Sequence, residues 1–271
     1  MALLPAGFRF SQASLATSER CLRRFYLRYL RRLNWPSSVR VAGAEKEEAA
    51  ERGRFFHQLI HQQTLGLEVE PLVAASGDPE LAIWWGNYLR QPPAGLPLGQ
   101  VFSELELWAP LGPWWLAARF DRVVVGQEGR LCIVDWKTGQ RPPSAYLSTW
   151  QTLVYCYVLS EGGALLKGGT PVEPGQISLC YWPAEFPDQV QWYRYSAVLH
   201  EQARVRLEEA AKALAGLETK EDFPKTQDQQ LCSDCEFQSF CARGAARGNG
   251  WGFAEEEEEE EDWEQFLRLE L

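Results

Sequence analysis

Asp135 and Lys137 end the apolar run LCIVDWKTG at residues 131–139, where a carboxylate and an ammonium could act together. Residues two apart on a strand project to the same face. Asp121 lies in the preceding apolar run, so a hairpin would bring its carboxylate beside that of Asp135. Two converging carboxylates repel each other unless a cation joins them, and oxygen ligands suit Mg²⁺ or Mn²⁺. The pattern indicates a metal-dependent site, in which a bound ion can polarise a phosphoryl oxygen and generate hydroxide from water, and Lys137 can orient that water. Taken alone, an Asp-x-Lys pair is far more often a surface salt bridge.

Side chains on two helical segments could complete such a site. His57 lies in GRFFHQLIH, and His61 follows one turn later on the same helical face. Gln151 and Tyr155 are also four residues apart, so they share a face that could reach a phosphate, the metal-bound water or Lys137. We expect His57 to be a ligand and His61 to be structural. Each pattern is weak by itself, and their order along the chain is what indicates a common site.

Hydrophobic periodicity defines the elements that must position these residues. Helical spacing predicts helices at residues 11–33, 43–66, 79–91, 143–163 and 197–217. Alternating or continuous apolar runs between glycine and proline turns predict strands at residues 101–111, 114–126, 130–139, 175–183 and 190–196. The sequence thus predicts an α/β fold with a helical N-terminal part, a central mixed sheet flanked by helices, and a Cys-rich C-terminal segment.

Four of the seven cysteines have the spacing of metal ligands. An odd number of cysteines does not suit a disulfide framework. Cys232, Cys235 and Cys241 form a C-x2-C-x5-C pattern, which in a reducing compartment points to a metal centre. Cys21, far upstream, is the obvious fourth ligand. Four thiolates suit zinc or an iron–sulfur cluster, and the spacing does not choose between them.

The series of motifs resembles the PD-(D/E)XK nuclease superfamily, and within it the RecB/AddB-like nuclease domains. The resemblance rests on GRFFH, ARFDRV, IVDWKTG and QTLVY and covers roughly residues 10–245. Ala118 stands where such domains often have glycine. The resemblance implies a restriction-endonuclease-like core whose metal ligands are His57, Asp121, Asp135 and the Trp136 backbone carbonyl. It also implies a catalytic set of Asp121, Asp135, Lys137, Gln151 and Tyr155.

The cysteine pattern is similar to that of RecB/AddB-like nucleases with an iron–sulfur staple and of the CRISPR-associated adaptation nucleases. In these proteins one cysteine precedes the nuclease core and three follow it. The resemblance therefore implies a [4Fe-4S] cluster, with Zn²⁺ as the alternative, on Cys21, Cys232, Cys235 and Cys241. The implied activity is that of a Mg²⁺- or Mn²⁺-dependent deoxyribonuclease, exonucleolytic on single-stranded DNA or DNA ends, in repair, recombination or CRISPR adaptation. A non-catalytic DNA-binding or scaffold module of a helicase–nuclease complex is the alternative.

The net charge of −10 is concentrated at the C-terminal end. Residues 254–271 contain ten acidic side chains and one arginine, so the rest of the chain is nearly neutral. We expect a nuclease domain at residues 1–245 and a disordered acidic tail at 246–271, whose amphipathic end could bind a protein partner. Without a signal sequence or an apolar run of at least about 18 residues, we expect a cytoplasmic protein with no membrane span. Aromatic residues interleave with the arginines that are candidates for binding the DNA backbone, Arg23, Arg24, Arg28 and Arg31.

Overall fold

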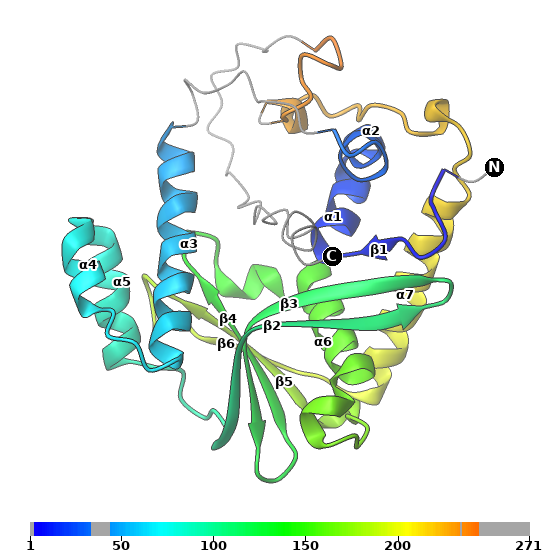
Figure 1. The fold of residues 1–271 in the computed structure, drawn as a ribbon. Helices are drawn as coiled ribbons and strands as arrows, with labels where there is room; N and C mark the ends of the chain where they lie inside the picture. Colours follow the sequence, from blue (N-terminus) through cyan, green and yellow to red (C-terminus); the bar gives the residue numbers. More distant parts are fainter. Residues whose placement is uncertain (1–2, 34–43, 234, 244–271) are drawn as a thin grey trace, which may run out of the picture.

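A six-stranded mixed β-sheet forms the centre of the protein in the computed structural model (Figure 1). The structure describes residues 3–33, 44–233 and 235–243. The strand order is β1-β3-β4-β5-β6, and β2 pairs with β3 off this path. Strand β4 is antiparallel to β3 and parallel to β5, so the predicted mixed sheet is confirmed. The strands are β1 (Arg9–Phe10), β2 (Gly99–Leu111), β3 (Trp114–Gly126), β4 (Leu131–Lys137), β5 (Ile177–Pro183) and β6 (Gln191–Arg194).

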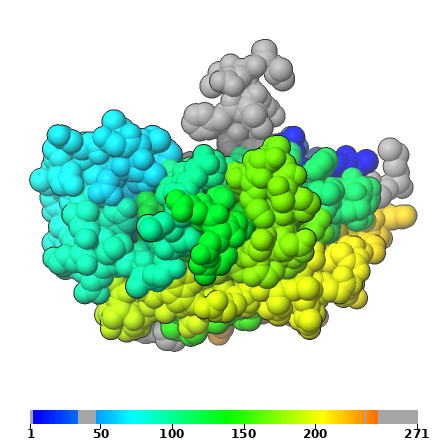
Figure 2. Space-filling view, turned by 90° about the horizontal axis from the view of Figure 1, so that it is seen from below, coloured from blue at the N-terminus to red at the C-terminus, as the bar shows by residue number. Residues whose placement is uncertain are grey.

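Helices cover both faces of the sheet, as predicted. Helices α3 (Ala44–Thr64) and α5 (Pro79–Arg90) pack on one face, with α4 (Glu70–Ser76) beside α5. Helices α1 (Gln12–Arg20), α6 (Trp150–Gly162) and α7 (Ala197–Ala215) pack on the other. The surfaces of α4–α5 (cyan) and α7 (yellow) lie on opposite sides of the strands (Figures 1 and 2). Helix α2 (Leu22–Phe25) follows α1 directly and continues into a π-helical turn at Tyr26–Leu30.

Strand β4 is the most deeply buried strand, and all seven of its residues are buried. Its apolar side chains alternate between two cores. Leu131 and Ile133 face the core under α6, whereas Val134 and Trp136 face the core under α3 and α5. This burial on both faces explains why the strand reads as a continuous apolar run. The same alternation places Asp135 and Lys137, at the end of the strand, on the α6 side of the sheet.

The β2–β3 hairpin is distorted where the candidate ligands lie. Its register pairs Ser103 with Arg122 and brings Glu104 opposite Asp121. Glu104 has a φ of 52°, which is uncommon for a residue other than glycine. Two consecutive residues of each strand contact α3: Ser103 and Glu104 reach His61 and His57, and Asp121 and Arg122 reach His57 and Thr64. Strict alternation would send one residue of each pair to the α6 side.

The N-terminal and C-terminal parts of the described chain meet at one end of the molecule. The cysteine-bearing segment around residues 231–241 (orange) lies close to α2 (Figure 1). The predicted acidic tail at residues 246–271 lies outside the described residues. In the described part of the chain, no helix is both long and apolar enough to span a membrane.

Candidate active site and cysteine cavity

Four of the predicted site residues form one hydrogen-bonded network between β4 and α6. Lys137 Nζ lies 2.9 Å from Asp135 Oδ2 and donates to Gln151 Oε1 at 2.9 Å. Gln151 Nε2 donates to Asp135 Oδ1 at 2.8 Å and to the Tyr155 hydroxyl at 3.3 Å. A single amide therefore contacts both members of the ion pair and the tyrosine one turn further along α6. The structure brings these four residues together, while their catalytic roles stay a prediction.

The Lys137 ammonium is held in a nearly closed environment. Its side chain is 4% exposed and that of Asp135 is 2% exposed. The ammonium lies 4.3 Å from the ring centroid of Tyr146 and 5.5 Å from that of Tyr181. A cation is attracted to the face of an aromatic ring, and this attraction strengthens when water is excluded. The two rings and the carboxylate therefore fix the position of the charge.

A second group, formed by His57, Glu104 and Asp121, lies on the α3 side of the sheet. One ligand atom of each residue lies within 4.8 Å of those of the other two. His57 Nδ1 is 3.2 Å from Asp121 Oδ1, and Glu104 accepts a hydrogen bond from Arg119 at 3.0 Å. Carboxylate oxygens suit Mg²⁺ and Mn²⁺, and imidazole nitrogen is a common ligand of transition metals. The donor set therefore fits a divalent cation.

Mutual electrostatic interactions shift the pKa values of this group. Burial lowers the pKa of His57, but the charge and hydrogen bond of Asp121 outweigh it and raise that pKa to about 9. Burial raises the pKa of Asp121, yet the His57 charge opposes it and leaves the pKa below its ordinary value. Burial, together with the Asp121 charge, raises the pKa of Glu104. A proton on His57 thus balances the carboxylates, and a bound divalent ion would replace that proton.

Trp136 connects the two groups. Its backbone N–H donates to Asp121 Oδ2 at 2.8 Å, and it stands between Asp135 and Lys137 in the chain. The Asp121 carboxylate therefore contacts both His57 and the end of β4. The Asp135 carboxylate contacts Lys137 and Gln151. Metal coordination by Asp135 and by the Trp136 carbonyl oxygen stays a prediction.

Glu104 is the site residue that the sequence motifs do not single out. VFSELELWAPL has the pattern of a regular alternating strand, which does not indicate that one of its acids turns toward α3. The usable signal is the tight turn at residues 112–113. Counting back equally along both strands from that turn places Glu104 opposite Asp121. Hairpin register, rather than a motif, identifies this residue.

Comparison with family models decides the family. Residues 9–242 match the model of the PD-(D/E)XK nuclease superfamily. The chain belongs to this superfamily. Membership implies a nuclease that acts on nucleic acids, and the mixed sheet flanked by helices is consistent with a restriction-endonuclease-like fold. A search of curated proteins finds no match. Among solved structures, the chain is similar to "Crystal structure of SSO0001", with 15% identity and a TM-score of 0.38, over 86% of this chain and 85% of that chain.

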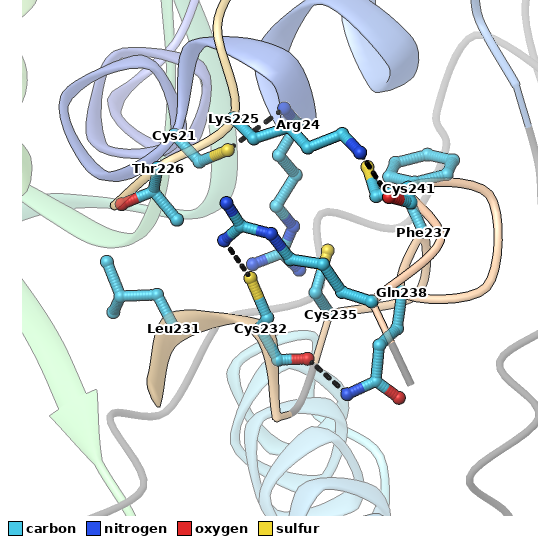
Figure 3. Close-up of a pocket in the computed structure, with 11 residues that line it drawn as sticks. Cys21, Arg24, Lys225, Thr226, Leu231, Cys232, Cys235, Phe237, Gln238 and Cys241 are labelled. Atoms are coloured by element: carbon cyan, nitrogen blue, oxygen red, sulfur yellow. Dashed lines mark hydrogen bonds between the residues drawn. The ribbon is translucent and has the colours of Figure 1, made fainter. Parts of the chain in front are cut away.

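The four predicted cluster ligands of this PD-(D/E)XK nuclease line one cavity (Figure 3). Cys21 lies at the junction of α1 and α2, and Cys232, Cys235 and Cys241 come from the C-terminal segment. In Figure 3 the labelled sulfur atoms surround a common space. Arg243 donates to Cys232 Sγ at 3.2 Å. The structure therefore brings together cysteines from the two ends of the nuclease domain.

The spacing of the four sulfurs can be compared with what each candidate centre requires. Among the described residues, no three cysteine sulfurs lie within 4.8 Å of one another. A tetrahedral zinc ion with Zn–S distances of about 2.3 Å needs sulfurs about 3.8 Å apart. Burial raises the pKa of Cys235 to about 11, so its thiol stays protonated until a cation binds. The sulfurs are therefore not already arranged around a zinc-sized centre, and the choice between zinc and a cluster stays a prediction.

The arginines predicted to bind DNA lie on or next to α2. Arg24 is buried and pairs with Glu236 at 2.8 Å, and Arg28 lies 3.7 Å from the same carboxylate. Arg23 lies over the ring of a neighbouring tyrosine, and Arg31 is exposed at the end of the π-helical turn. Arg24 therefore joins α2 to the cysteine segment of the nuclease. DNA binding by the four arginines stays a prediction.

Proposed function

We propose that the protein is a metal-dependent deoxyribonuclease of the RecB/AddB-like kind. The observation that carries the proposal is the Gln151 amide, which holds Asp135 and Lys137 together at 2.8 and 2.9 Å beside the His57–Asp121 pair. A cation site and a positioned ammonium then lie side by side. In the hydrolysis of a phosphodiester, the cation polarises a phosphoryl oxygen and the ammonium stabilises the charge that develops.

The side chains support Mg²⁺ or Mn²⁺ as the bound ion. His57, Asp121 and Asp135, with the Trp136 carbonyl, would hold the ion. Glu104 offers a further carboxylate within 4.8 Å of the His57 and Asp121 ligand atoms. When bound, such an ion polarises a phosphoryl oxygen and lowers the pKa of a bound water.

The remaining residues act through position and charge. Lys137 orients the attacking water and stabilises the negative charge that develops on the phosphoryl oxygens. Its ammonium is fixed before substrate binds, because the tyrosine rings and Asp135 already surround it. Gln151 fixes the Asp135–Lys137 geometry, and Tyr155 positions Gln151 through the 3.3 Å hydrogen bond.

The cysteine cavity supports a [4Fe-4S] cluster on Cys21, Cys232, Cys235 and Cys241, with Zn²⁺ as the alternative. All four cysteines line one cavity, and among the described residues no three of their sulfurs lie within 4.8 Å of one another, which supports a centre larger than a single ion. Such a cluster would tie α2 to the C-terminal segment and support the helices beside the active site.

The proposed substrate is single-stranded DNA or DNA ends, cut exonucleolytically in repair, recombination or CRISPR adaptation. Exposed basic side chains, such as Arg31 at the end of the π-helical turn, support binding to a nucleic acid backbone. A non-catalytic scaffold would need neither the buried ammonium nor the Gln151 bridge, so their presence favours the enzyme. A protein partner for the acidic tail stays a prediction.

Anaerobic purification followed by a visible spectrum, iron and zinc analysis, and DNA cleavage assays tests the proposal. Wild type should be brown and should cut labelled single-stranded DNA with Mg²⁺ or Mn²⁺. The double variant Asp135→Asn/Lys137→Met should bind the same DNA without cutting it. Glu106→Gln, on the same strand as Glu104, is the matched control and should retain cleavage.

Each part of the proposal can fail separately. A colourless, zinc-loaded protein would remove the iron–sulfur assignment. Cleavage by the double variant would remove the assigned active site. DNA binding without cleavage by wild type under every metal condition would favour the scaffold.

A further inference from the structure

Two cationic side chains lie close to the aromatic ring of Tyr146, just after the end of β4. Lys137 Nζ lies 4.3 Å and Arg141 Cζ lies 4.8 Å from its centroid, so the cations are no farther apart than the sum of these distances. Arg141 Nη2 also donates to the Ala145 carbonyl oxygen at 2.9 Å. Two prolines at residues 142–143 restrict the backbone in between. The guanidinium is therefore held near the ammonium.

Arg141 differs from Arg119 of β3 and from Arg130, just before β4, in having no acidic partner among the described residues. In the parts of the chain that the structure describes, no carboxylate forms an ion pair with the half-buried Arg141 side chain. Arg119, by contrast, pairs with Glu104, and Arg130 pairs with Glu128. Lys137 already has Asp135 as its partner at 2.9 Å, so the guanidinium of Arg141 is the charge that an added anion would balance. A planar guanidinium is suited to a phosphate group in particular.

Helix α6 adds positive potential at the same place. It begins at Trp150, one turn after Tyr146, and no side chain caps its N-terminus. Gln151, in its first turn, contacts Lys137 directly. The N-terminal end of a helix favours bound anions through its free N–H groups and its dipole. The N-terminus of α6, the Lys137 ammonium and the Arg141 guanidinium therefore lie in the same region.

We propose that Arg141 binds a phosphate of the nucleic acid strand next to the phosphodiester that is cut. The proposal rests on the proposed function, because it assigns a substrate contact at the same site. Arg141 then fixes the position of the nucleic acid strand relative to Lys137, because both cations are held against the Tyr146 ring. It contributes affinity for the backbone of any sequence, because a phosphate contact carries no base information.

DNA binding without cleavage tests this role. The probe is a labelled single-stranded DNA oligonucleotide in EDTA, titrated by fluorescence anisotropy at several salt concentrations between roughly 50 and 200 mM. Arg141→Gln should weaken binding about tenfold and lower the slope of log affinity against log salt by about 0.7 to 1, as expected for one lost phosphate contact. Arg130→Gln is the matched control at the opposite end of β4 and should leave affinity and slope unchanged.

One further variant and a melting curve make the result decisive. Arg141→Lys keeps the charge but loses the planar geometry, so it should recover only part of the affinity. A melting temperature for Arg141→Gln equal to that of wild type shows that the fold is intact. An unchanged salt slope for Arg141→Gln, or an equal loss for Arg130→Gln, would overturn the assignment while the nuclease proposal stands. A wild type that neither binds nor cuts DNA would instead overturn the proposed function.

Discussion

Replacing Lys137 by methionine should destabilise the protein as well as abolish cleavage. The Lys137 and Asp135 side chains are 4% and 2% exposed, with 2.9 Å between Nζ and Oδ2. Methionine keeps the apolar stem but removes the charge, so the Asp135 carboxylate stays buried without its cation. Removing one partner of a buried ion pair costs about 3–5 kcal/mol. For a domain of this size each kcal/mol lowers Tm by about 2–4 °C, so Tm should fall by about 10 °C.

The assay is thermal or urea unfolding in EDTA, so that no bound cation replaces the missing ammonium. Adding Asp135→Asn to Lys137→Met removes the isolated charge and should restore most of the lost stability. Both variants should be inactive, which separates the structural effect from the catalytic one. A free energy of unfolding for Lys137→Met within about 1 kcal/mol of wild type would refute the buried pair. A double variant no more stable than the single one would do the same.

Three further outcomes are expected. Because His57 has a pKa of about 9 and must lose its proton to bind metal, Mn²⁺ affinity measured by calorimetry should rise up to about tenfold per pH unit between pH 7 and 8. Gly53→Ala would place a Cβ 2.8 Å from Thr138 Oγ1, so it should displace the loop after Lys137 and lower kcat/KM severalfold with little loss of stability. Glu236→Ala removes the carboxylate paired with the mostly buried Arg24 at 2.8 Å, and urea unfolding should show a loss of about 2 kcal/mol, as for a hydrogen bond to a charged group.

Control variants distinguish the expected effects of Gly53→Ala and Glu236→Ala from the general effect of adding a methyl group or removing a carboxylate. Gly86→Ala, on α5, meets only the flexible Arg90 side chain at 3.2 Å and should leave kcat/KM unchanged. Glu128→Ala removes an exposed partner and should change stability by less than about 0.5 kcal/mol. A Mn²⁺ affinity that does not change with pH would contradict the assignment of His57 as a ligand that is protonated in the metal-free protein.

The elements with strong periodicity could be predicted from the sequence. The strand expected at residues 114–126 is β3 with the same bounds, and the helix expected at 43–66 is α3 at Ala44–Thr64. Short elements gave no comparable signal. β1 has two residues, and α4 has no buried residue, so neither leaves an apolar pattern long enough to detect.

The candidate site likewise contains contacts that sequence periodicity predicts and contacts that it does not. The contacts among Asp135, Lys137, Gln151 and Tyr155 follow from the period of a strand and the period of a helix, which are local properties. The positions of Glu104 and Asp121 depend on two consecutive residues of each strand facing α3, and period-two reasoning excludes that arrangement. The pairing of Arg24 with Glu236 joins segments at opposite ends of the domain, and helix periodicity does not indicate it.

The junction of Cys21 with Cys232, Cys235 and Cys241 has a consequence for the order in which the chain matures. A centre on these residues closes a loop of roughly 200 residues, and the entropic cost of closure grows only slowly with such length. During synthesis the first ligand is made long before the other three. Insertion of such a centre would therefore follow the synthesis of residue 241, when the sheet between the ligands already exists. Nascent or truncated chains that stop before residue 232 would stay unloaded.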